Sequence, residues 1–299
     1  MEKAYKRQAA LLLAVLPEVA KETCFALHGG TAINLFIRDM PRLSVDIDLT
    51  YLPIEDRSSS LTHIAEALER IKKNIEAVIP NVRILHRVDA AKLQVSVLGA
   101  DIKLEVNLIN RGALSAPIKM QLTARAQSEF DAFAAIHLVP FGQLYGGKIC
   151  AALDRQHPRD LFDIKYLLAN EGITPEVKKG FLLCLIASDR PMNEVIMPNL
   201  QDQRSALANQ FEGMSGEAFS YAEYEATRSK LIEATHASLT DEDRMFLLSV
   251  KNLTPNWSIH DFERFPAIRW KLQNLRRLKE TNPQKHLQHY EALKQKLSR

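Results

Sequence analysis

Hydrophobic and polar residues alternate along the first half of the chain in patterns that predict short strands separated by helices. Residues 43–49 alternate strictly, with Leu43, Val45, Ile47 and Leu49 on one face and Ser44, Asp46 and Asp48 on the other. That pattern is typical of a half-buried strand. Similar runs predict strands at 25–27, 82–86, 92–98 and 102–109, and helical spacing predicts helices at 1–24, 31–37 and 61–78.

The second half of the chain has a different pattern. Beyond about residue 140, period-two alternation nearly stops, and helical spacing interrupted by prolines continues to the end. The chain therefore predicts an α+β fold, in which residues 1–140 form a domain with a mixed sheet and helices. Residues 141–299 form a mostly helical second domain.

Composition narrows the class of protein. The 299 residues are 46% hydrophobic and 25% charged, which excludes a disordered chain, a collagen-like repeat and a coiled-coil rod. No run of about 18 apolar residues is present, so we expect no membrane span. Cys24, Cys150 and Cys184 lie in apolar surroundings and cannot all pair with one another, so we expect reduced thiols and a cytoplasmic location.

The strongest chemical signal is the pair Asp46 and Asp48. Two residues apart on a strand, their carboxylates project from one face, with backbones roughly 6.5–7 Å apart. Two such charges repel unless a cation lies between them, and hard oxygen ligands suit Mg²⁺ or Mn²⁺. The alternative is a solvated strand face without function.

A glycine turn precedes this strand. His28-Gly29-Gly30-Thr31-Ala32 stands between a predicted strand and a predicted helix. Paired glycines let the backbone approach a ligand closely, and the helix start offers N–H groups to a phosphate. An ordinary strand-to-helix turn would use the same residues. Together the turn and the acidic strand outline a site for a nucleoside triphosphate.

These two segments resemble the signature of the polymerase-β nucleotidyltransferase superfamily. The AbiEii toxin family, which is related to the MenT toxins, has a motif similar to the segment Arg42-Leu43-Ser44-Val45-Asp46-Ile47-Asp48-Leu49. The resemblance implies a polymerase-β-like domain with Asp46 and Asp48 as metal ligands and catalytic residues. It also implies that the nucleotide is bound by Gly29, Gly30, Thr31, Arg42 and Ser44.

Members of that superfamily usually carry a third carboxylate on a neighbouring strand. Glu105 shares a strand face with Lys103 and Asn107, and it could complete the metal set or accept a proton as a catalytic base. Asp101 lies at the start of the same strand and is the second candidate. The bland reading of Glu105 is a surface ion pair with Lys103.

A third cluster of charges surrounds Pro158. By itself this cluster indicates the start of a helix, with Pro158 in its first turn. Arg159 and Asp163 could then form an ion pair on the helix surface. The AbiEii resemblance implies more: Lys148 would contact the triphosphate, and Asp160 would orient that lysine or the acceptor hydroxyl. Lys148 and Asp160 should then lie within one side-chain length of the Asp46–Asp48 face.

Charge is uneven along the chain. The whole chain has a formal charge of only +3, yet from Glu263 to Arg299 ten lysines and arginines face three glutamates, an excess of seven positive charges. Such a segment can attract the phosphates of RNA. It can equally solvate a helix or contact a partner protein.

The prediction that follows is a magnesium-dependent nucleotidyltransferase that acts as the toxin of a toxin–antitoxin pair. It would transfer a nucleotide from an NTP to an acceptor, and the resemblance to MenT toxins favours RNA, specifically a tRNA 3′ end. A protein acceptor is the alternative enzyme, and a nucleotide- or RNA-binding toxin without turnover is the alternative from another class. The resemblance also implies a cognate antitoxin that is a DNA-binding repressor.

Overall fold

The computed structural model describes residues 1–298, and the chain divides into two compact units. The first unit contains Met1–Pro140 and Phe211–Ala218, and the second contains Phe141–Gln210 and Phe219–Arg299, of which Arg299 lies outside the described residues. The first segment of the first unit ends at Pro140, close to the residue where the sequence pattern changes. The pattern did not predict that residues 211–218 return to that unit.

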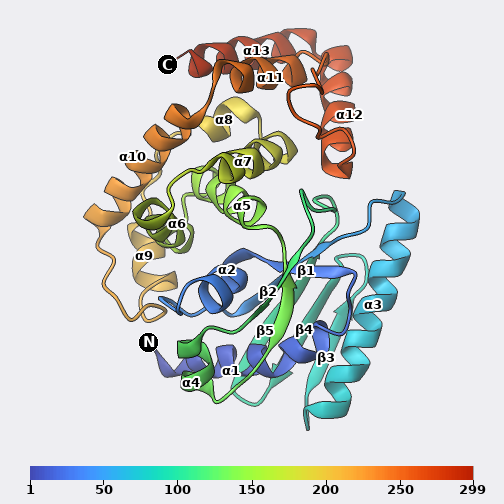
Figure 1. Ribbon diagram of the computed structural model, residues 1–299, viewed down its shortest axis with the longest axis vertical. Coiled ribbons are helices and arrows are strands. Elements are labelled where there is room, and N and C mark those ends of the chain that lie inside the picture. The colour runs from blue at the N-terminus through green and yellow to red at the C-terminus, as the bar shows by residue number, and fades with distance from the viewer. Residues whose placement is uncertain (299) are drawn as a thin grey trace. The chain divides into compact units, whose positions relative to one another are not determined.

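The first unit is a seven-stranded sheet with helices (Figure 1). Its helical segments are α1 (Lys3–Val19), α2 (Gly29–Ala32), η1 (Ile33–Ile37), α3 (Arg57–Val78) and α4 (Ala124–Phe130). Its strands are β1 (Phe25–His28), β2 (Asp46–Tyr51), β3 (Arg83–Arg87), β4 (Lys92–Val97), β5 (Ala100–Asn107), β6 (Ile118–Gln121) and β7 (Ala135–Leu138).

The sheet is mixed, with the strand order β3-β4-β5-β2-β1-β7-β6. Strand β2 runs parallel to β5, and β1 runs parallel to β7, whereas the other neighbours are antiparallel. The central pair β1–β2 places two strands that are adjacent in sequence side by side. The predicted α+β class with a mixed sheet is confirmed.

One face of the sheet forms the core of the first unit. Ile47, Leu93 and Leu104 are fully buried and lie in register on β2, β4 and β5. Helices α1 and α3 pack against each other and against β3, β4 and β5, so they cover this apolar face. The alternating residues of β2 and β5 therefore point to the opposite face.

Several local elements differ from the sequence-based expectation. The ladder of β2 begins at Asp46, while Arg42 bridges to Ser215 and Leu43 N–H donates to Met214 O at 2.8 Å. The helix after the glycine turn ends in a wide turn, in which Arg38 N–H donates to Ile33 O at 2.8 Å. Strands β6 and β7 were not predicted from the sequence.

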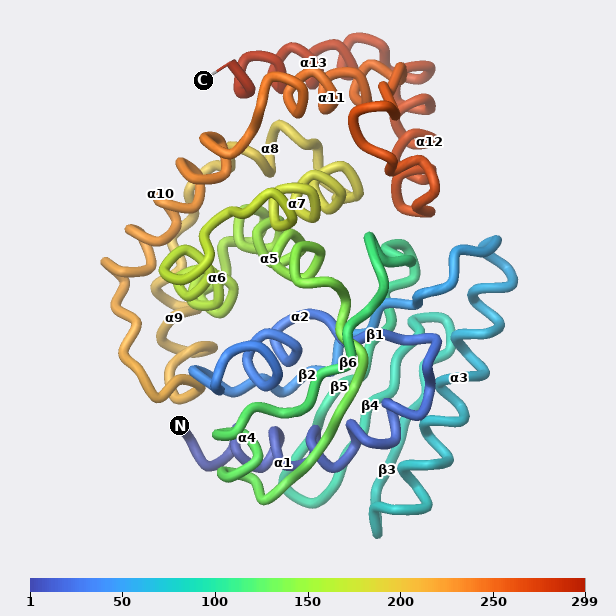
Figure 2. The backbone as a smooth tube through the Cα atoms, in the orientation of Figure 1, coloured from blue at the N-terminus to red at the C-terminus, as the bar shows by residue number. Residues whose placement is uncertain are grey.

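The second unit is helical, as expected (Figure 2). Its first helices are α5 (Phe141–Asp154), α6 (Pro158–Asn170), α7 (Pro175–Ala187), α8 (Met192–Ile196) and α9 (Arg204–Gln210). Its later helices are α10 (Tyr221–Ser238), α11 (Asp241–Lys251), α12 (Pro266–Thr281) and α13 (Pro283–Leu297).

Glycines bring α5 and α7 into very close contact. A Cβ atom added to Gly146 would overlap the backbone of Gly180, and one added to Gly180 would overlap the backbone of Gly142. The two helices therefore cross backbone to backbone, which any side chain at these positions would prevent. This crossing fixes the position of α5, the helix that carries Lys148.

None of the helices in residues 1–298 has both the length and the apolar character needed to cross a membrane. That finding agrees with the absence of a long apolar run in the sequence.

Candidate active site

The two aspartates of β2 lie on the sheet face opposite the apolar core. In register, Asp46 is opposite Lys103 and Asp48 is opposite Glu105 on the parallel strand β5. On the other side, Asp48 is opposite His28 of the antiparallel strand β1. Because registered neighbours share a face, β1, β2 and β5 present a row of polar side chains there. Both aspartates remain partly accessible.

The glycine turn contacts one of these carboxylates directly. Gly29 has φ +75°, a left-handed conformation that favours glycine, and a Cβ atom added to it would overlap Asp48 Oδ2. The backbone of the turn and the carboxylate of Asp48 therefore share one small space. His28, which precedes the helix, makes no side-chain capping hydrogen bond to its first turn.

Gly30 is close to the segment that precedes β2. A Cβ atom added to Gly30 would lie 2.8 Å from an Arg42 guanidinium nitrogen and 3.0 Å from Ser44 Oγ. Arg42 is only 2% exposed and Ser44 only 7% exposed. Three of the predicted nucleotide-binding residues, Gly30, Arg42 and Ser44, are thereby close together, although Arg42 follows Gly30 by 12 positions in the sequence.

The Thr31 side chain joins the turn to the acidic strand. Its hydroxyl donates to Asp46 O at 2.5 Å and lies 3.0 Å from Ser44 Oγ, and the residue is fully buried. The hydroxyl of Thr31, one of the predicted nucleotide-binding residues, thus fixes the turn relative to Asp46. The group of Thr31 that remains for a phosphate is its backbone N–H.

We expect Gly29→Ala to destabilise the protein and to displace the Asp48 carboxylate. A left-handed alanine costs about 1 kcal/mol, and the overlap with Asp48 adds about 1–3 kcal/mol. Gly172→Ala is the matched control, because Gly172 has φ +68° with no atom within 4 Å of an added Cβ. Urea unfolding monitored by circular dichroism gives both costs, and equal costs would show that Gly29 does not press on Asp48.

Glu105 lies on the same sheet face as Asp48, but its side chain is paired with Lys92 of β4. The ion-pair partner is therefore Lys92 rather than Lys103, the partner considered from the sequence. Asp101 is exposed at the start of β5, two residues before Lys103, where the pairing with β2 begins. Its backbone oxygen accepts a hydrogen bond from Gln8 Nε2 at 2.8 Å. The geometry favours Glu105 over Asp101 as the neighbour of Asp48.

The residues present fit a magnesium ion shared with a substrate. Within residues 1–298, no group of three or more His, Cys, Asp and Glu side chains is arranged to hold a metal ion. Asp46 and Asp48 supply two hard oxygen donors on one face, and Mg²⁺ commonly takes one or two carboxylates and completes its shell with substrate phosphates and water. The role of Glu105 as a third ligand stays a prediction.

The second group of predicted site residues lies in the second unit, where Lys148 holds two aspartates. Its Nζ lies 3.0 Å from Asp160 Oδ1 and 3.0 Å from Asp163 Oδ2. Lys148 is 7% exposed, and each aspartate is 1% exposed. The prediction that Asp163 forms a surface ion pair with Arg159 is wrong, because Asp163 is buried and pairs with Lys148.

Arg155 completes this group from the loop between α5 and α6. Its Nε and a terminal nitrogen donate to the two oxygens of Asp160 at 2.6 and 2.9 Å. Burial acts to raise the pKa of Asp160, but the charge of Lys148 and the hydrogen bonds and charge of Arg155 outweigh it and hold that pKa below its usual range. Asp160 is therefore a carboxylate at neutral pH, and it fixes the position of the Lys148 ammonium.

The loop that carries Arg155 is held by a residue that sequence reasoning missed. Gln156 is fully buried with φ +51°, and its Nε2 donates to Asn199 O at 2.7 Å. Its Oε1 accepts from Arg228 at 3.0 Å, and its backbone oxygen accepts from the Tyr224 hydroxyl at 2.7 Å. No local motif marks such a glutamine, because its partners are 43 to 72 residues away.

The structure thus gathers the predicted residues into two groups. Gly29, Gly30, Thr31, Arg42, Ser44, Asp46, Asp48 and Glu105 lie in the first unit, and Lys148 and Asp160 lie in the second. Pro158 occupies the first turn of α6, as expected, with His157 Nδ1 accepting from Arg159 N–H at 3.1 Å. The closeness of Lys148 and Asp160 to the Asp46–Asp48 face stays a prediction.

Comparison with known proteins extends the likeness seen in the motifs. The sequence model of the family "Nucleotidyl transferase AbiEii toxin, Type IV TA system" matches residues 10–274. No match was found among curated proteins. Among solved structures, the chain is similar to MenT4, a nucleotidyltransferase toxin from Mycobacterium tuberculosis H37Rv, with a TM-score of 0.62 and 13% identity over 91% of this chain and 93% of that one. At that identity the structural likeness shows the fold.

Proposed function

We propose that this chain, which belongs to the AbiEii nucleotidyltransferase toxin family of type IV toxin–antitoxin systems, transfers a nucleotide from an NTP to a hydroxyl group of RNA. The observation that carries the proposal is the contact between the glycine turn and the acidic strand. Gly29 lies against Asp48, and Gly30 lies against Arg42 and Ser44. One small region therefore offers both hydrogen-bond donors for a phosphate and carboxylate ligands for a metal ion.

The triphosphate would bind at the start of the helix after the glycine turn. The first N–H groups of a helix have no partner within the helix, so those of Gly29, Gly30 and Thr31, at the start of α2, suit an anion. Arg42 adds a buried guanidinium next to Gly30. A guanidinium group can donate hydrogen bonds to two phosphate oxygens at once. Ser44 adds a hydroxyl to the same region.

Asp46 and Asp48 would hold the metal ion against this triphosphate. When bound, Mg²⁺ (or Mn²⁺) supplies positive charge that stabilises the attacking and leaving oxygens. The protein's contribution is geometric: the strand keeps the two carboxylates on one face, and the Thr31 hydrogen bond to Asp46 O keeps the turn beside them.

In the proposed reaction, the acceptor hydroxyl oxygen attacks the α-phosphorus of the NTP. A new bond forms between that oxygen and the α-phosphorus, the bond from the α-phosphorus to the bridging oxygen breaks, and pyrophosphate leaves. Glu105, on the same face as Asp48, would accept the hydroxyl proton. Lys148, which Asp160 fixes in place, would offset the charge of the pyrophosphate.

RNA is the proposed acceptor, with a tRNA 3′ end as its specific form. The support is the basic segment Glu263–Arg299, although two of its lysines serve the fold. Lys271 donates to Ser188 O, and Lys296 donates to Asn193 O and Met197 O. Arg276 and Arg277 are exposed on α12 and remain for phosphate contacts.

A transfer assay separates the possible acceptors. The purified protein is incubated with Mg²⁺, each α-labelled NTP in turn, and either total RNA, purified tRNA or a mixture of proteins. We expect label to enter RNA, and label in proteins alone would replace RNA with a protein acceptor. Binding of NTP without any transfer would support a toxin that acts by binding.

We expect Arg276→Gln/Arg277→Gln to weaken RNA binding and to reduce its salt dependence. Each phosphate contact on a single strand contributes a slope of about −0.7 in log K against log salt, so losing two contacts removes about 1.4 from that slope. The measurement is RNA affinity at several salt concentrations. Unchanged affinity and slope would assign this segment to helix solvation or to the antitoxin.

Membership of a toxin–antitoxin family implies a cognate antitoxin. We propose that this antitoxin is a DNA-binding repressor, as the family resemblance implies. Co-expression with the neighbouring gene product would then restore growth of cells that express the chain.

A further inference from the structure

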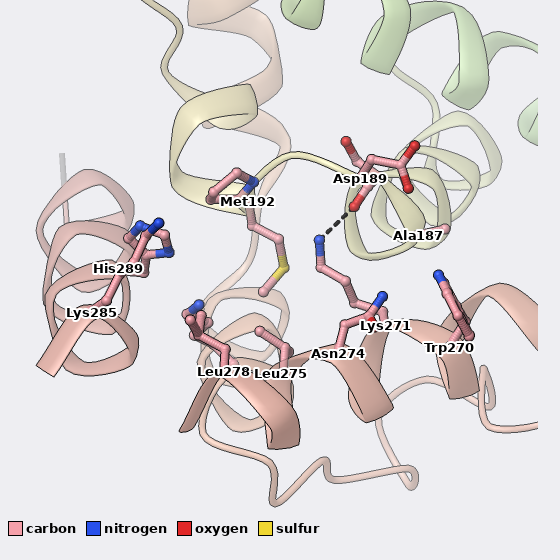
Figure 3. A pocket seen from close by; sticks show the side chains of 13 residues that line it. Ala187, Asp189, Met192, Trp270, Lys271, Asn274, Leu275, Leu278, Lys285 and His289 are labelled. Atoms are coloured by element: carbon pink, nitrogen blue, oxygen red, sulfur yellow. Dashed lines mark hydrogen bonds between the residues drawn. The ribbon is translucent and has the colours of Figure 1, made fainter. Parts of the chain in front are cut away.

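The second unit contains a cavity of about 190 Å³ with a basic lining (Figure 3). It is bounded by the link between α7 and α8 and by residues of α11, α12 and α13. Its charged and titratable lining residues are Asp189, Lys251, Lys271, Lys285 and His289. Three ammonium groups therefore face one carboxylate. The lining shares no residue with the candidate active site.

One of these lysines has a structural role. Lys271 Nζ donates to Ser188 O at 2.5 Å and to Arg190 O at 2.9 Å, so it holds the link between α7 and α8. Figure 3 shows this side chain extended toward the link that carries Asp189. Burial lowers the pKa of Lys271 to about 8, and the nearby charge of Asp189 opposes that effect.

Lys251 has no such role. It is only 3% exposed, and within residues 1–298 its ammonium group has no hydrogen-bond or ion-pair partner. Burial and the charge of Lys271 lower the pKa of Lys251 to about 8. Its backbone is held in place, since Lys251 O lies 3.0 Å from His286 Nε2. The Lys251 nitrogen is not fully enclosed by protein atoms, and the side chain lines the cavity, where an anionic ligand would pair with its charge.

Other lining groups could complete the coordination of an anion. Lys285 and His289 reach the cavity from α13, and Asn274 reaches it from α12 (Figure 3). Burial and the charges of Lys251 and Lys285 lower the pKa of His289, so it is a neutral ring with one N–H donor at pH 7. Met192, Leu275 and Leu278 give the cavity an apolar side.

We propose that this cavity binds the phosphate group of a small molecule, with Lys251 as its principal ligand. A phosphate presents several acceptor oxygens, which match the ammonium, imidazole and amide donors of the lining. A cavity of about 150 Å³ holds a molecule the size of benzene, so this one holds a phosphate with a small organic group at most. The source is either inorganic phosphate or a phosphorylated small molecule such as a nucleoside monophosphate.

The test compares the full-length wild type with Lys251→Met, which removes the charge and keeps the length of the side chain. Melting temperature is measured in an anion-poor buffer and with increasing inorganic phosphate. We expect phosphate to raise the melting temperature of the wild type and not that of Lys251→Met. In the anion-poor buffer, Lys251→Met should melt higher than the wild type, because it no longer buries an unpaired charge.

Binding is then measured by calorimetry with inorganic phosphate, pyrophosphate and a nucleoside monophosphate as separate probes. Lys251→Met should lose at least about tenfold in affinity, as expected for a hydrogen bond to a charged group. Lys230→Met, an exposed lysine of α10, is the matched control and should bind as the wild type does. Tighter binding of the monophosphate identifies a phosphorylated small molecule as the source, and equal binding identifies inorganic phosphate.

Two results would overturn the proposal. One is a wild-type melting temperature that does not change with any of the three probes. The other is equal phosphate binding by the wild type and Lys251→Met. Lys285→Gln provides a second check, since loss of this exposed charge should weaken binding by a smaller factor without affecting the fold.

Discussion

Asp46→Asn should remove nucleotidyl transfer while the protein remains folded. Asp46 and Asp48 share one face of β2, and the metal ion they would hold stabilises charge that develops in the transition state. Loss of a preorganised electrostatic group of this kind typically costs about 10²–10³-fold in rate. The measurement is the initial rate of label transfer from an α-labelled NTP to RNA, at several Mg²⁺ concentrations.

Asp101→Asn is the matched control for this result. Asp101 is an exposed carboxylate at the start of β5, two residues before Lys103, where the pairing of β5 with β2 begins. Its replacement should leave the rate within about twofold, because a surface charge of this kind contributes little. If Asp46→Asn kept full activity, or if both variants lost the same amount of activity, the assignment of Asp46 to the active site would be wrong.

Asp160→Asn should strongly destabilise the second unit at neutral pH. Asp160 is buried, and it binds both Lys148 and Arg155. Removing one member of a buried ion pair leaves the other without compensation, which costs about 3–5 kcal/mol. Urea unfolding at pH 7 measures this loss. Glu194→Gln, which breaks an exposed pair with Arg190, should cost well under about 1 kcal/mol.

The same variant should change how stability depends on acid. The folded protein holds the pKa of Asp160 below its usual range, so this group stabilises the fold above its unfolded pKa of about 3.9. That stability is lost as the pH falls through the lower, folded-state pKa. The difference between wild type and Asp160→Asn should therefore be constant above about pH 5 and shrink below about pH 4. A difference that stays constant to pH 2 would exclude a depressed pKa.

Much of the first group of site residues could be predicted because its signals are local. Period-two alternation depends only on the pleat of one strand, so Asp46 and Asp48 could be placed on one face without knowing the sheet. The paired glycines likewise identify a turn by their own geometry. The contact between Gly29 and Asp48 could not be predicted from either pattern alone, since it depends on the pairing of β1 with β2.

The parts that were missed depend on distant residues or on weak patterns. Strand β6 is an edge strand whose Ile118 is 55% exposed, so no apolar alternation marks it. Gln156 is held by Arg228, 72 residues away. Lys92 displaced Lys103 as the partner of Glu105 because the neighbouring antiparallel strand places Lys92 opposite Glu105. Each of these features follows from the fold rather than from a local motif.

The measurement that tests the central claim most directly compares two labels on the same NTP. The purified protein is incubated with Mg²⁺, RNA and an NTP labelled either at the α-phosphate or at the γ-phosphate. The account predicts that only the α-label enters RNA, and that labelled pyrophosphate is released from the γ-labelled substrate. Transfer of the γ-label to RNA would contradict the account. So would the absence of both labelled RNA and labelled pyrophosphate with each of the four NTPs.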